Sequence, residues 1–431
     1  MRHVFICPVL TIILLLGSSQ ETVYAQDIPT LPISSIVIMG NEVTENNVIL
    51  RELVVHVGDI PTKELIDVSR KRLMNLLLFN RVELNLYPQD HQAQILMIEV
   101  TERIYFYPVP ILNFHERDWS KVSYGLGLVN VNFRGQAEQV WGGLWLGYRP
   151  GFGISFSDQW AGDSLHLSTG FGFTKTTYVH RTLDFEERHI FANTSLGKWW
   201  GYHFRTSLNF NYDRINVDPP YAALMHSGQN TEHTFGIQLA FRYDTRDLYF
   251  YPSSGWLNQF NIIQYGLFEP YNDYINLSGD IRKFLKIGPL IFAARLMQNS
   301  LFGQIPVYRI NYIGFSERIR GHFYTVWEGR HIQMGSLETR FGIIPVQYFS
   351  MNLPGIPAQY LHNLKIGLSG ALFIDSGIAW THAEEYAIEN FHSGFGMGLH
   401  FHLPYVEIMR LDYAFDRDFR GQLIFEIGVV F

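Results

Sequence analysis

The sequence predicts an all-β transmembrane barrel of about 16 antiparallel strands, preceded by one small α/β domain. Three observations support this fold class. Aromatic residues make up 15% of the 431 residues, glycines number 37, and charged residues account for only 17%, against about 25% in soluble domains. After the first 25 residues no run of 18 apolar residues occurs, so a transmembrane helix is not expected. From about residue 105 onward, apolar residues recur with the two-residue period of strands.

The start of the chain has the pattern of an export signal. A positively charged beginning leads into an apolar stretch at residues 9–16, and a small-x-small cleavage pattern ends at Ala25. We therefore expect residues 1–25 to be a signal peptide and residues 26–32 to be a linker. The single cysteine, Cys7, lies inside this predicted signal peptide. The mature protein is thus expected to form no disulfide and no thiolate metal site.

Residues 33–103 are expected to form the small α/β domain, with the element order β-α-α-β-β. Its first segment is a short apolar run that is expected to form a strand, and Thr44 is placed to cap a helix that carries Ile49 and Leu53 at i, i+4 spacing. A longer helix with one apolar face and two alternating strands complete the domain. The segments that carry these five elements are residues 36–39, 44–53, 65–76, 82–86 and 94–101.

Residues 104–431 are expected to form the barrel. The last strand shows the pattern most clearly, because alternate residues from Leu423 to Phe431 are apolar, whereas Gln422 and Glu426 lie among those on the other face. Such alternation places apolar residues toward lipid and polar or small residues toward the lumen. A soluble β-sandwich would show the same alternation and is the alternative. At roughly 20 residues per tilted strand and its connection, the segment accommodates about sixteen strands, and closure is expected because lipid cannot satisfy an open edge.

Two segments supply a charged pair. In the first, Arg320 lies beside Gly321, and in the second, Phe373, Asp375 and Gly377 lie on one face of a strand. A guanidinium forks onto a carboxylate with two hydrogen bonds, which lysine cannot reproduce, and glycine permits a tight loop tip. Such a pair can pin a loop inside a polar lumen. The alternative is an ordinary lumenal salt bridge that only stiffens the barrel.

Other polar clusters predict little chemistry. The acidic turn at residues 244–247 is interpreted as a solvated hairpin turn. His400 and His402 share a strand face, but no third ligand has the spacing of a zinc site. No G-x-S-x-G, H-E-x-x-H or P-loop motif is present. We therefore expect no enzyme, no metal site and no cofactor, and the net charge of −7 argues against a nucleic-acid partner.

Five segments, taken together and in their order along the chain, resemble the BamA/TamA-type outer-membrane assembly superfamily, also called the bacterial surface antigen family. They are residues 132–136, 153–160, 243–256, 305–323 and 373–380. The fourth segment carries the family's V-R-G-F signature, from which Ile319 and His322 depart. Residues 33–103, with Gly40-Asn41 after the first strand, resemble a single POTRA domain. The resemblance implies that Arg320 lies at the tip of a long loop folded into the lumen, with Asp375 as its partner on the inner wall.

The same resemblance implies a factor that inserts or translocates other proteins. A periplasmic POTRA domain would offer a strand edge to an extended client. A seam between the first strand, near residues 105–114, and the last, residues 421–431, would open to the client's strands. Gly421 and Gly428 would loosen that last strand. Phe425, Ile427 and Phe431 would belong to its barrel signal.

Location and partners follow from this resemblance too. We expect the chain in the outer membrane of a Gram-negative bacterium. The expected partners are outer-membrane lipids, unfolded or exported client proteins, and periplasmic or lipoprotein accessory subunits.

Three alternatives stay open. A secretion transporter for a dedicated exoprotein would share the arginine loop, but it usually carries two POTRA domains and a plug helix, which the sequence does not show. A barrel that serves a separately encoded lipase-like passenger is a second alternative, and no hydrolase segment is present here. A passive pore would leave the N-terminal α/β domain unexplained.

Overall fold

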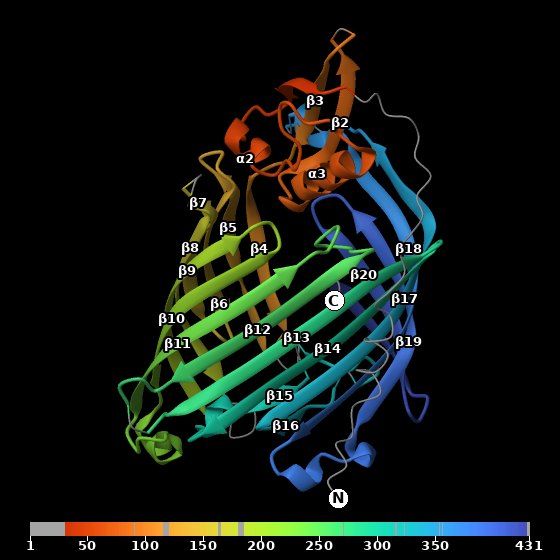
Figure 1. Cartoon of the computed structure of the whole chain (residues 1–431). Coiled ribbons are helices and arrows are strands. Elements are labelled where there is room, and N and C mark those ends of the chain that lie inside the picture. The colour runs from red at the N-terminus through yellow and green to blue at the C-terminus, as the bar shows by residue number, and fades with distance from the viewer. Residues whose placement is uncertain are drawn as a thin grey trace, which may run out of the picture.

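The structure, a computed structural model, describes residues 31–89, 91–114, 120–162, 165–179, 185–269, 271–314, 317–322, 324–352, 354–355 and 357–428. A small N-terminal unit lies over one mouth of a large curled sheet, whose strands run obliquely around a lumen (Figure 1). The predicted signal peptide and Phe431 lie outside the described residues. Within the described residues, no helix is long and apolar enough to cross a membrane.

The N-terminal unit has the predicted element order. Its elements are β1 (Ile33–Met39), α2 (Asn46–Leu50), α3 (Lys63–Asn75), β2 (Phe79–Pro88) and β3 (Gln94–Glu102). The strands form a sheet in the order β1-β3-β2, in which β1 runs parallel to β3 and β2 runs antiparallel to it. Ile49, Leu73 and Ile98 are fully buried between the helices and the sheet. The unit therefore has its own apolar core.

Thr44 does not cap α2 as the sequence predicts. Glu45 is the N-cap residue, and its side chain makes no capping hydrogen bond. The Oγ1 of Thr44 instead lies 2.9 Å from the Tyr105 hydroxyl and accepts a hydrogen bond from Asn132 Nδ2 at 2.9 Å. Because Tyr105 and Asn132 belong to the large sheet or its approach, the threonine joins the two parts of the molecule.

The large sheet has sixteen strands, each antiparallel to its neighbours. Strands that follow one another along the chain are neighbours in this sheet, and the longest segment between two of them separates β14 from β17. The strands are β4 (Phe106–Phe114), β5 (Val122–Phe133), β6 (Glu138–Gly147), β7 (Gly151–Ala161), β8 (Leu167–Val179), β9 (Glu186–Trp200), β10 (Phe204–Asn216), β11 (Thr231–Asp244), β12 (Gly255–Tyr265), β13 (Tyr274–Ile287), β14 (Leu290–Gly303), β17 (His331–Phe349), β18 (Leu364–Trp380), β19 (His392–Leu403), β20 (Glu407–Asp416) and β21 (Gly421–Ile427).

The period-two pattern of the sequence determines which side chains face outward. In β18, Leu372 and Ile374 are exposed on the outer face, whereas Phe373 and Asp375 are buried on the inner face. The same alternation recurs along β21, where Leu423, Phe425 and Ile427 are exposed. The predicted sixteen-stranded antiparallel sheet is thus confirmed.

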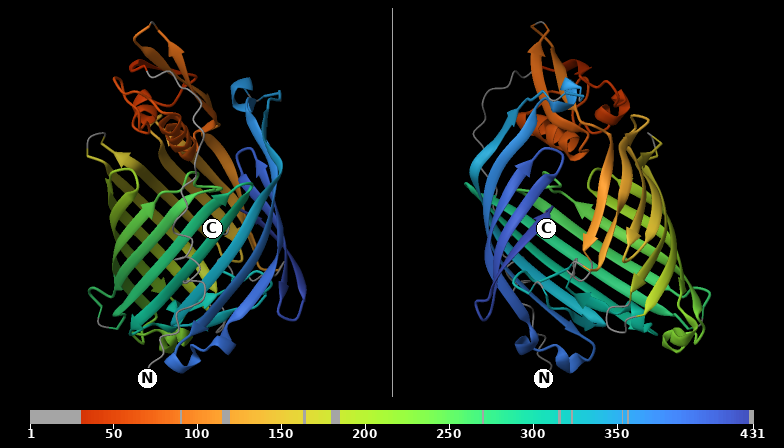
Figure 2. Two further views of the ribbon diagram at one scale, coloured as in Figure 1. Left: turned by 45° about the vertical axis from the view of Figure 1, so that its right-hand side comes forward. Right: turned by 180° about the vertical axis from the view of Figure 1, so that it is seen from behind.

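Complete closure of the sheet, which the sequence predicts, is not observed. The strands β4 and β21 are the two ends of the sheet, and within the described residues no backbone pairing joins them. They face each other across a boundary that we call the seam (Figure 2, right). The last strand ends at Ile427, so Gly428 follows the strand and does not lie within it.

Residues 304–330, between β14 and β17, form a segment that we call the lumenal loop. It contains the short strands β15 (Asn311–Ile313) and β16 (Trp327–Gly329), which pair with each other, and the 3-10 helix η3 (Val307–Arg309). The other 3-10 helices lie between strands of the large sheet and are η2 (Pro219–Leu224), η4 (Ala358–Leu361), η5 (Ala383–Glu385) and η6 (Ile388–Asn390). Ile313, Ile319 and Arg320 of this loop are almost completely buried.

The N-terminal unit contacts several turns around the mouth of the sheet. The hydrogen bonds run from Glu45 N to Gly135 O at 3.0 Å, from Asn75 Nδ2 to Asp247 O at 3.1 Å, from Asn80 Nδ2 to His362 O at 3.2 Å and from Asn363 Nδ2 to Thr101 Oγ1 at 2.9 Å. These contacts involve the β5–β6, β11–β12 and β17–β18 connections. The unit is therefore held across the mouth at well-separated points of the rim.

Candidate functional site

Arg320, at the tip of the lumenal loop, contacts three strands of the inner wall. Its Nε and Nη2 donate to the two carboxylate oxygens of Asp375 on β18 at 2.7 and 2.9 Å. Its backbone N–H also donates to Asp375, at 3.1 Å. Nη1 donates to Glu338 on β17 at 2.8 Å and lies 3.6 Å from the Asp412 carboxylate on β20. The forked geometry is the strong, bidentate form of this ion pair.

The aromatic ring of Phe373 forms the floor beneath the guanidinium. The Arg320 Cζ lies 3.5 Å from the centre of that ring, within the range of a cation–π contact. Phe373 and Asp375 come from the same strand at i, i+2 spacing, so both side chains face inward. One strand thus supplies both the carboxylate and the ring that hold the arginine.

Two glycines let the loop tip press against the wall. Gly321 has a φ of +98°, and a Cβ there would lie 2.4 Å from the carbonyl oxygen of Phe415. On the facing strand β19, a Cβ at Gly394 would lie 1.8 Å from the carbonyl oxygen of Arg320. Both a left-handed backbone and close backbone approach require glycine. Gly377, the other predicted glycine, makes room for Ile313 of the lumenal loop, whose Cδ1 would lie 3.2 Å from a Cβ there.

The pair at Arg320 belongs to a larger charged cluster that the sequence interpretation missed. Four arginines and four carboxylates are joined by ion pairs in it, so its formal charges balance. The arginines are Arg318, Arg320, Arg340 and Arg410, and the carboxylates are Glu338, Asp375, Asp412 and Glu426. The sequence does carry a signal for part of this cluster. Glu338 and Arg340 are two residues apart on one strand, as are Arg410 and Asp412 on another, and residues at this spacing have side chains on the same face of the strand.

The cluster reaches the last strand. Glu426 of β21 forms ion pairs with Arg318 of the lumenal loop and with Arg410 of β20. Arg410 Nε donates to the carbonyl oxygen of Gly428 at 2.7 Å, and Gly428 N donates to Ile408 O at 2.8 Å. The end of the sheet is therefore tied to the loop tip by side chains as well as to β20 by its backbone.

The structure places the other predicted residues of the last strand on its outer face or at its ends. Phe425 and Ile427 are 60% and 68% exposed. Gly421 begins the strand, and a Cβ there would lie 2.3 Å from the Tyr413 hydroxyl. Phe431 lies outside the described residues. Among the predicted residues of this end of the chain, Gly428 is the one whose carbonyl oxygen accepts a hydrogen bond from the cluster, from Arg410.

The β11–β12 turn, predicted to be solvated, instead folds inward. The side chain of Asp244 is 1% exposed and accepts hydrogen bonds from Arg242 and Arg246. Farther along the turn, the Tyr251 ring lies 4.6 Å from the Arg340 guanidinium, and Arg340 Nη1 donates to Pro252 O at 3.4 Å. The ion pairs neutralise the buried aspartate, which explains why the acidic turn need not stay in water.

The two histidines considered as metal ligands have other partners. The Tyr251 hydroxyl lies 3.0 Å from His400 Nδ1, and the Ser369 hydroxyl lies 2.8 Å from His402 Nε2. Across the described ranges, no group of three or more histidine, cysteine, aspartate or glutamate side chains is arranged to hold a metal ion. The lumenal histidines therefore belong to the hydrogen-bonded lining of the barrel.

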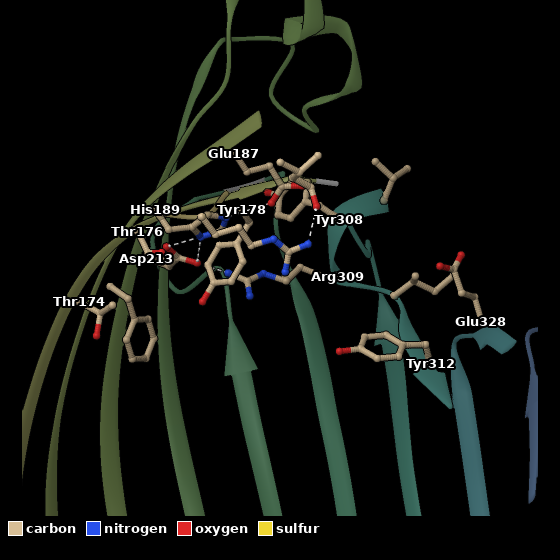
Figure 3. A pocket seen from close by; sticks show the side chains of 15 residues that line it. Thr174, Thr176, Tyr178, Glu187, His189, Asp213, Tyr308, Arg309, Tyr312 and Glu328 are labelled. Carbon is tan, nitrogen blue, oxygen red and sulfur yellow. Dashed lines mark hydrogen bonds and ion pairs between the residues drawn. The ribbon is translucent and has the colours of Figure 1, made fainter. Parts of the chain in front are cut away.

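A second attachment holds the lumenal loop at the opposite wall. Arg309 forms an ion pair with Asp213 of β10, whose carboxylate also lies 3.1 Å from His189 Nδ1. These residues border a cavity of 410 Å³ between β8–β10 and residues 307–312 of the loop (Figure 3). The loop thus spans the lumen from one wall to the other and is anchored by an arginine at each side.

Comparisons with known proteins agree with this architecture. The Omp85 superfamily domain matches residues 132–431. A search of curated protein sequences found no match. BamA from Haemophilus ducreyi lacking POTRA domains 1–3 is a similar solved structure, with a TM-score of 0.52, 14% identity, and 92% of this chain and 83% of that chain covered.

Two further solved structures are similar. CdiB from Escherichia coli has a TM-score of 0.55 at 10% identity, with 93% of this chain and 75% of that chain covered. CdiB from Acinetobacter baumannii has a TM-score of 0.50 at 14% identity, with 91% and 70% covered. Identities this low establish a shared fold only. The family match, in contrast, spans well over half of the chain, and the chain therefore belongs to the Omp85 superfamily of outer-membrane proteins.

Proposed function

We propose that this protein inserts or translocates client proteins at the bacterial outer membrane, through its N-terminal unit and the seam of its barrel. The observation that carries the proposal is the unpaired seam, at which β4 and β21 each have only one backbone neighbour within the described residues. Unpaired strand edges recruit other strands. A sheet that leaves two edges facing each other is suited to accept the strands of a second protein.

The side chains and segments that fill the lumen favour a client route through the seam over a route through the centre of the barrel. The lumenal loop crosses the lumen and is anchored to β10 and β18. The β11–β12 turn folds in from the mouth that the N-terminal unit covers. A passive pore would need the lumenal loop, the β11–β12 turn and the N-terminal unit to move aside. Strand exchange at the seam does not require the loop or the turn to leave the lumen.

We assign the N-terminal unit, residues 33–103, as a single periplasmic POTRA domain and residues 104–431 as the barrel. The β-α-α-β-β order and the exposed edge of the β1-β3-β2 sheet support this assignment. Such an edge can bind an extended client segment by strand addition. Periplasmic or lipoprotein accessory subunits and outer-membrane lipids would be its further partners.

A transporter for one dedicated secreted protein is the second candidate, and the fold shared with CdiB favours it. Depletion of the protein followed by quantitative proteomics of the outer membrane and of the medium separates the two functions. A general loss of outer-membrane barrels would support assembly. Loss of one secreted protein alone would support the dedicated transporter, and an unchanged proteome would refute both.

A further inference from the structure

The two edges of the seam differ in the hydrogen-bond donors that they present. This difference can be read from the backbone, because opposite residues of an antiparallel pair alternate between those that bond to each other and those whose N–H and C=O point away. One known hydrogen bond therefore fixes the direction of every other residue in the same register.

On β4, the reference hydrogen bond joins Val131 N to Tyr105 O at 2.9 Å. It continues the register in which Phe106 is opposite Asn130 and Phe114 is opposite Val122. Odd-numbered residues of β4 therefore point their backbone groups at β5. Even-numbered residues point theirs at the seam, and these are Phe106, Pro108, Pro110, Leu112 and Phe114.

Proline has no backbone N–H. Pro108 and Pro110 occupy two consecutive seam-facing positions, so β4 presents no donor to the seam between Phe106 and Leu112. At about 3.3 Å per residue, this donor-free stretch is about 20 Å long. Proline at a sheet edge is a general means of blocking strand addition.

On β21 the corresponding edge is complete. Arg420 O accepts from Asp416 N at 3.3 Å, and Gly428 N donates to Ile408 O at 2.8 Å, which places the even-numbered residues toward β20. The residues that face the seam are Gly421, Leu423, Phe425 and Ile427. None is proline, so each presents both an N–H and a C=O.

We propose that β21 is the edge that receives a client strand, and that Pro108 and Pro110 weaken the closure of β4 onto β21 so that a client can replace β4. This inference rests on the proposed function. Pairing β4 with β21 would leave carbonyl oxygens of β21 without donors at two positions. A client strand without proline would supply the missing N–H donors, which lipid cannot supply.

The side chains of β21 indicate the kind of client. Leu423, Phe425 and Ile427 are 65%, 60% and 68% exposed on the outer face. A neighbouring strand that continues this apolar outer face must itself alternate between apolar and polar residues. The partner is therefore an antiparallel strand of another membrane β-barrel.

The first experiment tests the seam without any client. The double variant P108V/P110V restores both donors with a residue that favours strands, and P345V in β17, a strand away from the seam, is the matched control. In each background, a cysteine at Ile111 is combined in turn with one at Leu423, Ile424 or Phe425. Disulfide formation is measured in purified, full-length protein in lipid vesicles, and heat-modifiable migration confirms that each barrel is folded.

We expect the best cysteine pair to form its disulfide at least tenfold faster in P108V/P110V than in the parent or in P345V. Equal rates in all three folded proteins would overturn the role of the prolines. If P108V/P110V fails to fold, the single variants P108V and P110V replace it. We expect each to raise the rate of disulfide formation by an intermediate amount, and an unchanged rate would contradict the role of the prolines.

The second experiment identifies the client edge. The probe is a urea-unfolded outer-membrane barrel protein with one cysteine in its last strand, diluted into vesicles that contain this protein with a cysteine at Phe425 or at Leu112, which are 60% and 58% exposed. We expect mixed disulfides at Phe425 to exceed those at Leu112 at least tenfold. A majority at Leu112 would refute the assignment of β21. No adduct at either edge, with the seam result as expected, would refute the proposed handling of clients and leave the weakened closure established.

Discussion

Removing either partner of the Arg320–Asp375 pair should destabilise the barrel and release the lumenal loop. Both side chains are at most 2% exposed, so water cannot replace the lost partner. Breaking a buried pair by removing one member costs about 3–5 kcal/mol, because the other charge is left uncompensated. Arg320→Ala leaves the balanced cluster one negative charge in excess, and Asp375→Ala leaves it one positive charge in excess.

The double variant R320A/D375A restores the balance, with three arginines facing three carboxylates. It should therefore cost about 1–3 kcal/mol less than the sum of the two single changes. Equilibrium unfolding in urea, followed by tryptophan fluorescence of the barrel in vesicles, measures all three costs. Arg320→Lys is the control for charge alone, since lysine keeps the charge but cannot make the two parallel hydrogen bonds to Asp375.

Strict additivity of the two single costs would refute the coupling. Full stability of Arg320→Lys would instead refute the role of the fork, because the geometry assigns the stability to the two hydrogen bonds on Asp375 together with the bond to Glu338. Protease cleavage within residues 304–330 gives an independent reading of loop order. It should increase in both single variants even where the strands remain intact.

Three further predictions concern other parts of the chain. Residues 31–105, expressed alone, should fold as an α/β domain around their own core, and a circular dichroism spectrum without helix would contradict this. Burial raises the pKa of Glu52 above its ordinary value of 4.5, against the opposing effect of Arg72 and Arg51. Its stabilising contribution is therefore present below that ordinary value and lost as pH rises through the raised one. E52Q should flatten the dependence of urea unfolding on pH above about 4.5, and an unchanged slope would contradict this prediction. Deletion of Phe431 should lower the amount of heat-modifiable barrel in the outer membrane, and equal yields would show that the residue is not part of the barrel signal.

The sequence was sufficient for the features that depend on local pattern. The change from helical to two-residue periodicity separates the N-terminal unit from the sheet, and alternation places Phe373 and Asp375 on one face. Contacts between residues far apart in the chain could not be predicted from the sequence in the same way. Nothing adjacent to Glu426 indicates that Arg318 of the lumenal loop is its partner, since 108 residues separate them. The inward fold of the β11–β12 turn was likewise hidden, because ion pairing of Asp244 is a tertiary property.

Arg318 couples the lumenal loop to the seam, and this coupling can be tested against a matched residue of the same loop. Arg318 pairs with Glu426, whereas Arg309 pairs with Asp213 on the opposite wall. Each arginine therefore anchors the loop, but only Arg318 also holds β21.

R318Q should speed amide hydrogen exchange at Gln422 and Ile424, whose N–H groups face β20, more than R309Q does. The double variant R318Q/E426Q should accelerate exchange little more than E426Q alone, because E426Q already removes the partner of Arg318. Equal acceleration in R318Q and R309Q would mean that any loosening of the loop frees the last strand. The specific link between Arg318 and Glu426 would then have no role in holding β21 in place.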